Sequence, residues 1–302
     1  MARRVEQKAA ARERIAAQLA AQQRAERRRR LLLALGAVVV VIVVVAGLVT
    51  IRLVGGGKKT ATGPSGAADT QIMTALTSIP ESTFSAVGVE GVQATPSAIT
   101  APALTANGKP KVLYIGAEFC PYCAAERWPV TVALSRFGTF SNLGTTHSSG
   151  SDVFPNTPTL SFHGATYSSQ YLAFTGVETT TNEQVGGQYK PLDTPTAQDQ
   201  KTFDTYNQPP YVKSGGSIPF IDLGGKFVSS GATYSPEVLA GKTQAQVADA
   251  LKDPSSPIAK AVIPSANVYT AAICKLTNNQ PTAVCSSDAV TVAAAKLGGG
   301  KG

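Results

Sequence analysis

Residue types suited to metal or hydrolytic chemistry are scarce in this 302-residue chain, which has two histidines, four cysteines and one tryptophan. His147 and His163 are too few for a histidine-based metal cluster, and no G-x-S-x-G motif supplies the nucleophile of a serine hydrolase. No cysteine precedes Cys120, which argues against a lipid-modified N-terminal cysteine. We therefore expect neither a metal nor a cofactor, and the cysteines are the residues on which to base a chemical hypothesis.

Charge is also scarce, at 15% of residues, and the net charge of +8 is concentrated at one end. Residues 1–30 contain ten Lys/Arg against three Asp/Glu, so this tail holds nearly all of the positive excess. Because the remainder is close to neutral, the sequence gives little support for a nucleic-acid-binding fold. The simplest role for the tail is a topology signal that also attracts anionic lipid.

No charged residue occurs from Leu31 to Ile51, a run of 21 residues. At about 1.5 Å per residue this run is long enough to cross about 30 Å of hydrocarbon. A cleaved signal peptide is the alternative, but its apolar core is typically only about 7–15 residues long. The sequence therefore predicts a transmembrane helix within residues 31–54.

The flanks of this span differ in charge, with Arg27 to Arg30 on one side and fewer basic residues on the other. The positive-inside rule then assigns residues 1–30 to the cytoplasm. Residues 55–69, rich in Gly and small polar residues, are typical of a flexible linker. We expect a single-pass cell-membrane protein whose residues 70–302 form an extracytoplasmic domain, where disulfides persist.

The most informative stretch joins a strand to a cysteine pair. Val112 to Ile115 is a β-branched and aromatic run ended by Gly116, which predicts a buried strand. Cys120 and Cys123 follow where a helix should begin, with Pro121 suited to its first turn. A thiolate at a helix N-terminus is stabilised by unpaired amides and the helix dipole, so Cys120 should ionise more readily than a free cysteine. In a redox pair Cys120 would attack and Cys123 would resolve.

Other interpretations of the cysteines are a static disulfide, a zinc site and haem attachment. A zinc site of all four cysteines is disfavoured, because ten residues separate Cys274 from Cys285 and an oxidising compartment disfavours thiolate ligands. Haem attachment requires histidine where Ala124 stands. Cys274 and Cys285 are expected to form a structural disulfide, with an electron relay to Cys120 and Cys123 as the alternative.

Two carboxylates flank the motif. Glu118 and Glu126 could each accept a proton from Cys123 if buried nearby, although a solvated carboxylate is the commoner case. Their negative charge would oppose thiolate formation. We expect Trp128 to pack in the core beside the motif.

Elsewhere the patterns are coarser. Ser/Thr and aromatic residues at 159–178 are typical of a hairpin, and Leu143 to Ser148 is a candidate strand. A second hairpin is predicted from Phe220 to Leu223, a Gly-Gly turn and a strand ending at Val228. Helices are expected at 197–206, after a capping box formed by Thr243 and Gln246, at 259–276 and at 288–297.

The motif Cys120-Pro121-Tyr122-Cys123, with Ile218-Pro219 before a hairpin, resembles the thioredoxin superfamily over about residues 109–252. The central Pro-Tyr also matches the usual glutaredoxin dipeptide. This resemblance implies that the Ile218–Pro219 bond is cis and faces the cysteines, and that Pro121, Tyr122, Ile218 and Pro219 contact substrate. The sequence departs from a compact thioredoxin in that Pro219 follows Cys123 by 96 positions, which leaves the surface of residues 138–216 unassigned.

A more specific resemblance is to a membrane-anchored, thioredoxin-like family described as domain of unknown function 929. The stretches that carry it are YIGAEFCPYCAAERW, SDVFPNTPTLSFHG, IPFIDLGGKFV and AAICKLTNNQPTAVC. It covers most of residues 70–300 and assigns no substrate. It implies an α/β, thioredoxin-like domain with an insertion and extra C-terminal helices, preceded by one transmembrane helix.

The functional expectation is a membrane-anchored, extracytoplasmic thiol-disulfide oxidoreductase. Its partners would be proteins that carry thiols or disulfides, and the topology is compatible with a membrane redox partner. The alternative is a non-enzymatic binding or scaffold module of the cell envelope, in which Cys120 and Cys123 form a locked disulfide.

Overall fold

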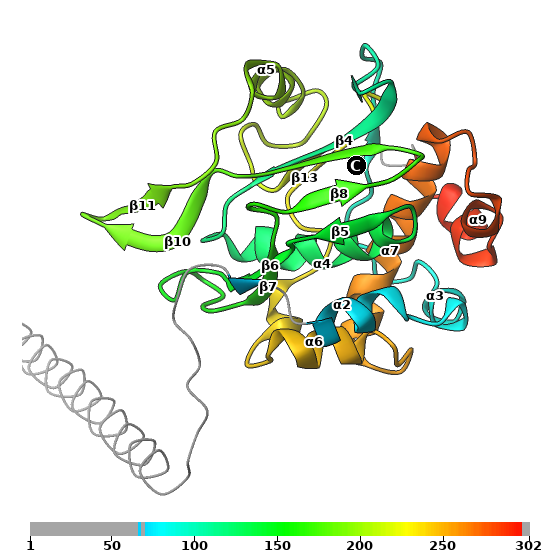
Figure 1. Cartoon of the computed structure of the whole chain (residues 1–302), viewed down its shortest axis with the longest axis horizontal. Coiled ribbons are helices and arrows are strands. Elements are labelled where there is room, and N and C mark those ends of the chain that lie inside the picture. Colours follow the sequence, from blue (N-terminus) through cyan, green and yellow to red (C-terminus); the bar gives the residue numbers. More distant parts are fainter. Residues whose placement is uncertain (1–65, 68–69, 298–302) are drawn as a thin grey trace, which may run out of the picture. The chain divides into compact units, whose positions relative to one another are not determined.

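A central sheet organises the protein, whose computed structural model describes residues 66–67 and 70–297. The predicted cytoplasmic tail, transmembrane helix and most of the linker lie outside these residues. Within the described ranges, no helix is both long and apolar enough to cross a membrane. The described residues combine this sheet with packed helices in a mixed α/β fold (Figure 1).

Strand β4 (Lys109–Gly116) lies at the centre of the sheet, and its residues from Lys111 onward are buried. It pairs in parallel with β9 (Ala173–Glu178) and antiparallel with β12 (Phe220–Leu223). The remaining strands extend this sheet at its edges: β13 (Phe227–Ser230) beside β12, β2 (Ser97–Ala98) beside β13, and β3 (Thr105–Ala106) on β4.

Alternation along β4 sends successive side chains to opposite faces of the sheet. Val112 and Tyr114 join the large core, which includes residues from α4 (Pro121–Ser135) and α7 (Pro257–Leu276). Leu113 and Ile115 belong to a smaller cluster, against which Phe203 packs. Both faces of β4 are therefore covered, which explains why its sequence is continuously apolar rather than alternating.

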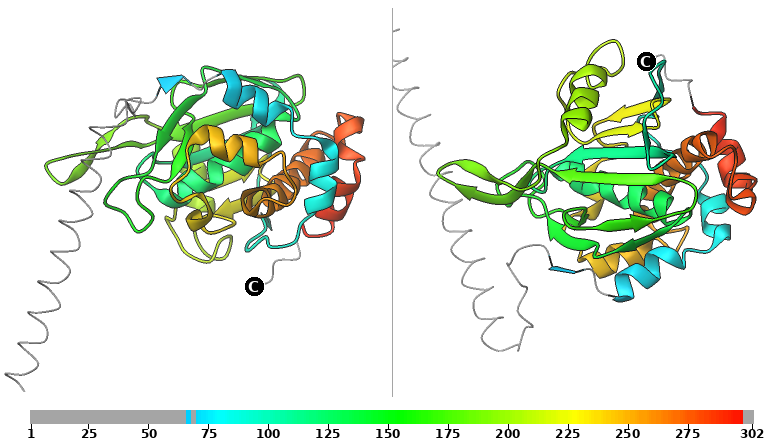
Figure 2. Two further views of the ribbon diagram at one scale, coloured as in Figure 1. Left: turned by 90° about the horizontal axis from the view of Figure 1, so that it is seen from below. Right: turned by 45° about the horizontal axis from the view of Figure 1, so that its top comes forward.

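The helices fall into two groups. Phe203 belongs to α5 (Ala197–Tyr206), which stands apart from the helices gathered around α7 (Figure 2). That group comprises α2 (Thr70–Thr77), α3 (Glu81–Val87), the 3-10 helix η1 (Pro236–Leu239), α6 (Gln244–Ala250), α8 (Thr282–Cys285) and α9 (Asp288–Ala294). Helix α4 packs most extensively on α7, so the helix that begins at the cysteine motif is enclosed between the sheet and other helices.

Several local predictions are confirmed. The hairpin of β12 and β13, α5 and a capping box between Thr243 and Gln246 at the start of α6 all occur where they were expected. Helix α7 begins two residues before the predicted start at 259, and α9 ends at Ala294 rather than at 297. Trp128 is fully buried, as expected, and its indole N–H donates to the Pro158 carbonyl oxygen at 3.0 Å.

One prediction is wrong, and two further segments have structure that the sequence did not indicate. Residues 159–178 do not form a hairpin but belong to β7 (Pro158–Ser161), β8 (Thr166–Ser168) and β9, which pair with three different strands: β6 (Gly144–His147), β5 (Thr139–Ser141) and β4. Near the end of the predicted linker at 55–69, a short strand, β1 (Gly66–Ala67), pairs with β6, while the rest of that linker lies outside the described residues. The polar region after residue 178 forms a projecting hairpin of β10 (Thr180–Val185) and β11 (Gln188–Pro191) (Figure 1).

Candidate functional site

The cysteine motif forms the N-terminus of α4. Cys120 is the N-cap residue with extended backbone angles (φ −76°, ψ 121°), and Pro121 occupies the first turn. The Cys120 Sγ accepts a hydrogen bond from the Cys123 backbone N–H at 3.3 Å. This is the role that a Ser or Asp oxygen fills at most helix starts, so the sulfur directly faces unpaired amides of the first turn.

Burial distinguishes the two sulfurs, both of which are free thiols. Cys120 is 6% exposed and Cys123 is 0% exposed. The pKa of Cys120 is lowered, mainly by a hydrogen bond from the Cys123 side chain, while burial opposes this change. Burial raises the pKa of Cys123 well above its ordinary value. The direction for Cys120 agrees with the sequence prediction, and only Cys120 offers surface to an incoming group.

A proline loop forms the wall opposite the motif. The Ile218–Pro219 peptide bond is cis, as the thioredoxin resemblance implied. The Cys120 thiol donates to the Ile218 carbonyl oxygen at an Sγ to O distance of 3.9 Å. This proximity follows from strand register, because Phe220 pairs with Ile115 and thus brings the start of β12 to the end of β4 from which the motif leaves.

Aromatic side chains border the motif on its outer side. Tyr122, at 43% exposed, contacts Phe154 edge to face with ring centroids 5.9 Å apart. Phe119 stacks on Tyr189 of β11 with centroids 4.2 Å apart. Of these four residues only Tyr122 was predicted from the sequence, because the other contacts depend on tertiary structure.

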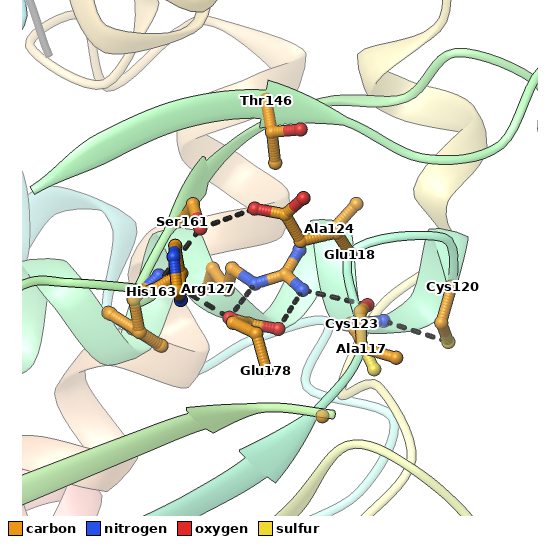
Figure 3. Close-up of polar contacts among 12 residues, drawn as sticks. Ala117, Glu118, Cys120, Cys123, Ala124, Arg127, Thr146, Ser161, His163 and Glu178 are labelled. Atoms are coloured by element: carbon orange, nitrogen blue, oxygen red, sulfur yellow. Dashed lines mark hydrogen bonds and ion pairs between the residues drawn. The ribbon is translucent and has the colours of Figure 1, made fainter. Parts of the chain in front are cut away.

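Beneath the motif lies an ion pair that the sequence analysis also missed. Arg127 and Glu178 are both fully buried, and two guanidinium nitrogens of Arg127 donate to the Glu178 carboxylate at 2.7 and 2.5 Å. Figure 3 shows this guanidinium between Glu178 and the backbone of Ala117, beside Cys123. One signal was available in the sequence, since Arg127 follows Cys123 by four residues and therefore shares its helix face.

Glu118 and Glu126 are both buried, so the solvated alternative for them is wrong. The Glu118 carboxylate accepts a hydrogen bond from the Ser161 hydroxyl at 2.6 Å (Figure 3). Glu126 accepts from the Thr233 backbone N–H at 2.8 Å and from the Tyr269 hydroxyl at 2.5 Å. Burial raises the pKa of Glu126 to about 7. These contacts direct Glu126 toward α7 and the segment after β13.

The second cysteine pair forms the predicted disulfide. Cys274 of α7 and Cys285 of α8 are bonded with their Cα atoms 5.6 Å apart. Because these sulfurs bond to each other, they are not available for a zinc site with Cys120 and Cys123. Among residues 66–67 and 70–297, no group of three or more His, Cys, Asp or Glu residues is arranged to hold a metal ion.

The segment that carries this site matches a protein-family model. The family model described as "Domain of unknown function (DUF929)" matches residues 96–189 and 184–275, more than half of the chain. The chain belongs to the DUF929 family. No curated protein and no solved structure matched it. The DUF929 match includes the cysteine motif and the Ile218–Pro219 loop, and it extends to Cys274 but not to Cys285.

Proposed function

We propose that this DUF929 protein is a thiol-disulfide oxidoreductase that acts on protein clients. The observation that carries the proposal is the position of Cys120, which caps α4 and has its sulfur 3.9 Å from the Ile218 carbonyl oxygen. A helix start supports a thiolate, and the neighbouring wall leaves one sulfur slightly exposed for exchange.

The proposal includes a thioredoxin-like fold. Its support is the order of elements along the chain: β4, α4 beginning at the cysteines, the parallel strand β9, a cis-proline, the antiparallel hairpin of β12 and β13, and then α6. In this interpretation the strands and hairpin within residues 138–216, together with α5, are the insertion, and α7 to α9 are the extra C-terminal helices.

The chemistry follows from the different burial of the sulfurs. The Cys120 thiolate attacks one sulfur of a client disulfide, forms a mixed disulfide and releases the other client sulfur as a thiolate, which takes a proton from water. Cys123 then loses its proton, and its thiolate attacks the Cys120 sulfur of the mixed disulfide, which closes the Cys120–Cys123 disulfide and releases the second client sulfur as a thiolate that takes up that proton. The client gains two electrons and the enzyme loses two. The reverse sequence oxidises a client dithiol, and a dithiol or disulfide partner restores the starting state.

Several features favour protein clients over small thiols. The Ile218 carbonyl is a backbone acceptor beside Cys120, suited to a peptide N–H, and the exposed ring of Tyr122 offers an apolar contact. Pro121 and Pro219 are buried and would shape this surface from beneath. With the predicted membrane anchor, the domain would meet clients outside the cytoplasm, where a membrane redox partner could recycle it.

Trapping tests the proposal. In the full-length Cys123→Ser protein, a mixed disulfide on Cys120 cannot be resolved and should accumulate as client adducts that a reductant releases. The Cys120→Ser/Cys123→Ser protein is the matched control and should form none. The absence of adducts on Cys123→Ser, together with no activity of the wild type on a scrambled disulfide protein, would reject the proposal.

Redox titration separates this function from the scaffold alternative. A working catalyst should have a Cys120–Cys123 reduction potential between about −270 and −120 mV, whereas a structural bridge should lie below about −300 mV. The lowered pKa of Cys120 favours the first range, because a stabilised thiolate stabilises the reduced form.

A further inference from the structure

The Arg127–Glu178 pair is an unusual element for the interior of this domain. Both side chains are fully buried, on α4 and at the end of β9. Desolvating two charges is costly, and a pair of apolar residues would often serve stability equally well. The pair therefore calls for a role other than stability, and its location suggests one.

Arg127 lies directly beneath the cysteines. It follows Cys123 by one helical turn, and its Nη2 donates to the Ala117 carbonyl oxygen at 2.8 Å. The Ala117 backbone also acts to lower the pKa of the Cys123 thiol, against the effect of burial. In Figure 3 the Ala117 carbonyl that accepts from Arg127 lies beside Cys123.

The two members of the pair are not equivalent toward the cysteines. Glu178 accepts from Nε and Nη2 of Arg127, whereas Nη2 also donates to the Ala117 carbonyl oxygen, so it is Arg127 that contacts the segment before the cysteines (Figure 3). The Arg127 Nη1 has no hydrogen-bond partner among the described residues, and neither has the Tyr114 hydroxyl, although the Tyr114 ring centroid is 5.9 Å from the guanidinium carbon. The Arg127 guanidinium therefore keeps one nitrogen, Nη1, that donates no hydrogen bond to another described residue.

We propose that Arg127 is a positioning residue whose charge stabilises the thiolates of Cys120 and Cys123 in turn, while Glu178 holds its guanidinium in place. This inference rests on the proposed oxidoreductase function. The sequence suggested that the negative charges of Glu118 and Glu126 would oppose thiolate formation. In this inference the charged group that acts on the thiols is instead the cation Arg127.

The electrostatics agree with this geometry. A hydrogen bond from Cys123 is the main cause of the lowered pKa of Cys120, and the charge of Arg127 acts in the same direction. Burial raises the pKa of Cys123, and Arg127 opposes that rise. The other ionisable groups buried around the site, Tyr114, Glu118 and Glu178, carry no positive charge. To resolve the mixed disulfide, Cys123 must lose its proton although its side chain has no exposed surface. A buried cation that stabilises the Cys123 thiolate therefore matters most at that step.

The test measures thiolate formation in full-length protein, by ultraviolet absorbance and by the pH dependence of alkylation. The disulfide of Cys274 and Cys285 does not titrate, so the signal reports Cys120 and Cys123. Arg127→Met should raise the pKa of Cys120 by about one unit, a tenfold loss of thiolate below that pKa. Glu178→Gln should shift it in the opposite direction, and Arg127→Lys should retain most of the wild-type value.

A matched control lies at the other end of the same helix. Arg136, the C-cap residue of α4, pairs with Glu81 at 2.6 Å, so Arg136→Met and Glu81→Gln remove charges from a more exposed pair at the end of α4 far from the motif. Neither should move the pKa of Cys120. The inference is rejected if Arg127→Met and Glu178→Gln shift that pKa in the same direction, as general loosening of the fold would, or leave it unchanged.

The isosteric Glu178→Gln and the charge-preserving Arg127→Lys provide the test if Arg127→Met does not fold. These pKa measurements need no client, so they are independent of the trapping experiment. If the pKa shifts occur as expected but no client adducts form, the oxidoreductase function is rejected and the role of Arg127 is kept. If client adducts form but the pKa shifts do not occur, the role of Arg127 is rejected and the function is kept.

Discussion

The Tyr269 hydroxyl on α7 donates a 2.5 Å hydrogen bond to the Glu126 carboxylate on α4. The Thr233 backbone N–H donates to the same carboxylate at 2.8 Å, and the Thr233 hydroxyl donates to it as well. A single buried acid thus links the helix that carries the cysteines to α7 and to the segment after β13. Its protonation state must influence how firmly these elements are held.

This acid predicts a pH dependence of stability. Burial raises the pKa of Glu126 from 4.5 to about 7, so between these values the folded state binds more protons than the unfolded state. Through this group the free energy of unfolding should therefore fall as pH rises from about 4.5 to about 7, by about 3 kcal/mol. Glu126→Gln should flatten this slope in denaturant titrations across the window. Glu90→Gln, at an exposed site, is the control and should leave the slope as in the wild type.

Removing the Cys274–Cys285 disulfide should affect stability without affecting exchange chemistry. The sequence separation is 11 residues, and closing a loop of that size contributes about 3 kcal/mol in the chain-entropy model. The Cys274→Ser/Cys285→Ser protein should unfold at lower denaturant concentration and still form client adducts when Cys123→Ser is added. Loss of those adducts from a folded protein would instead favour the electron-relay alternative.

The Lys111–Asp199 ion pair should be important for attaching α5 to the sheet. The Lys111 Nζ lies 2.5 Å from Asp199, and their side chains are 11% and 2% exposed. Lys111→Met leaves an uncompensated buried carboxylate and should lower the free energy of unfolding by about 3 kcal/mol. Lys190→Met breaks an exposed pair with Glu183 and should leave the free energy of unfolding nearly unchanged, because solvent screens that pair. Equal effects of the two substitutions in calorimetry would contradict this assignment.

The turn between β12 and β13 requires glycine at position 225. Gly225 has φ of +70°, and a Cβ there would lie 2.3 Å from the Pro102 carbonyl oxygen. Gly225→Ala should therefore destabilise the protein by more than the roughly 1–3 kcal/mol of the backbone conformation alone. Gly108→Ala isolates that backbone cost, because Gly108 has φ of +73° with nothing within 4 Å of an added Cβ. The difference between the two melting curves measures the clash.

Local signals in the sequence predicted the strand–helix motif and the hairpin after Pro219, whereas the position of Ile218–Pro219 opposite the cysteines was implied by the thioredoxin resemblance. The apolar run before Gly116, Pro121 after the capping cysteine and the Gly-Gly turn after Leu223 each act over a few residues, so propensity and turn chemistry were sufficient. The disulfide of Cys274 and Cys285 was also predicted, since the spacing suited a loop between helices.

Long-range pairing was beyond the same reasoning. Residues 159–178 have strand-forming composition, but composition does not indicate that β9 returns to pair in parallel with β4. The hairpin of β10 and β11 lacks an apolar face, and only the turn at Gly186 and Gly187 indicated it. Arg127 meets Glu178 only because that parallel register ends with Glu178 beside Gly116.

The register of β12 has a mechanical consequence. This strand is hydrogen-bonded to β4 on one side and to β13 on the other, so the sheet fixes the position of the Ile218 carbonyl, two residues before the strand begins. Cys120 moves instead with α4. The distance between the Cys120 sulfur and the Ile218 carbonyl oxygen therefore depends on how α4 packs on the sheet. A change in the packing beneath α4 lengthens or shortens that distance.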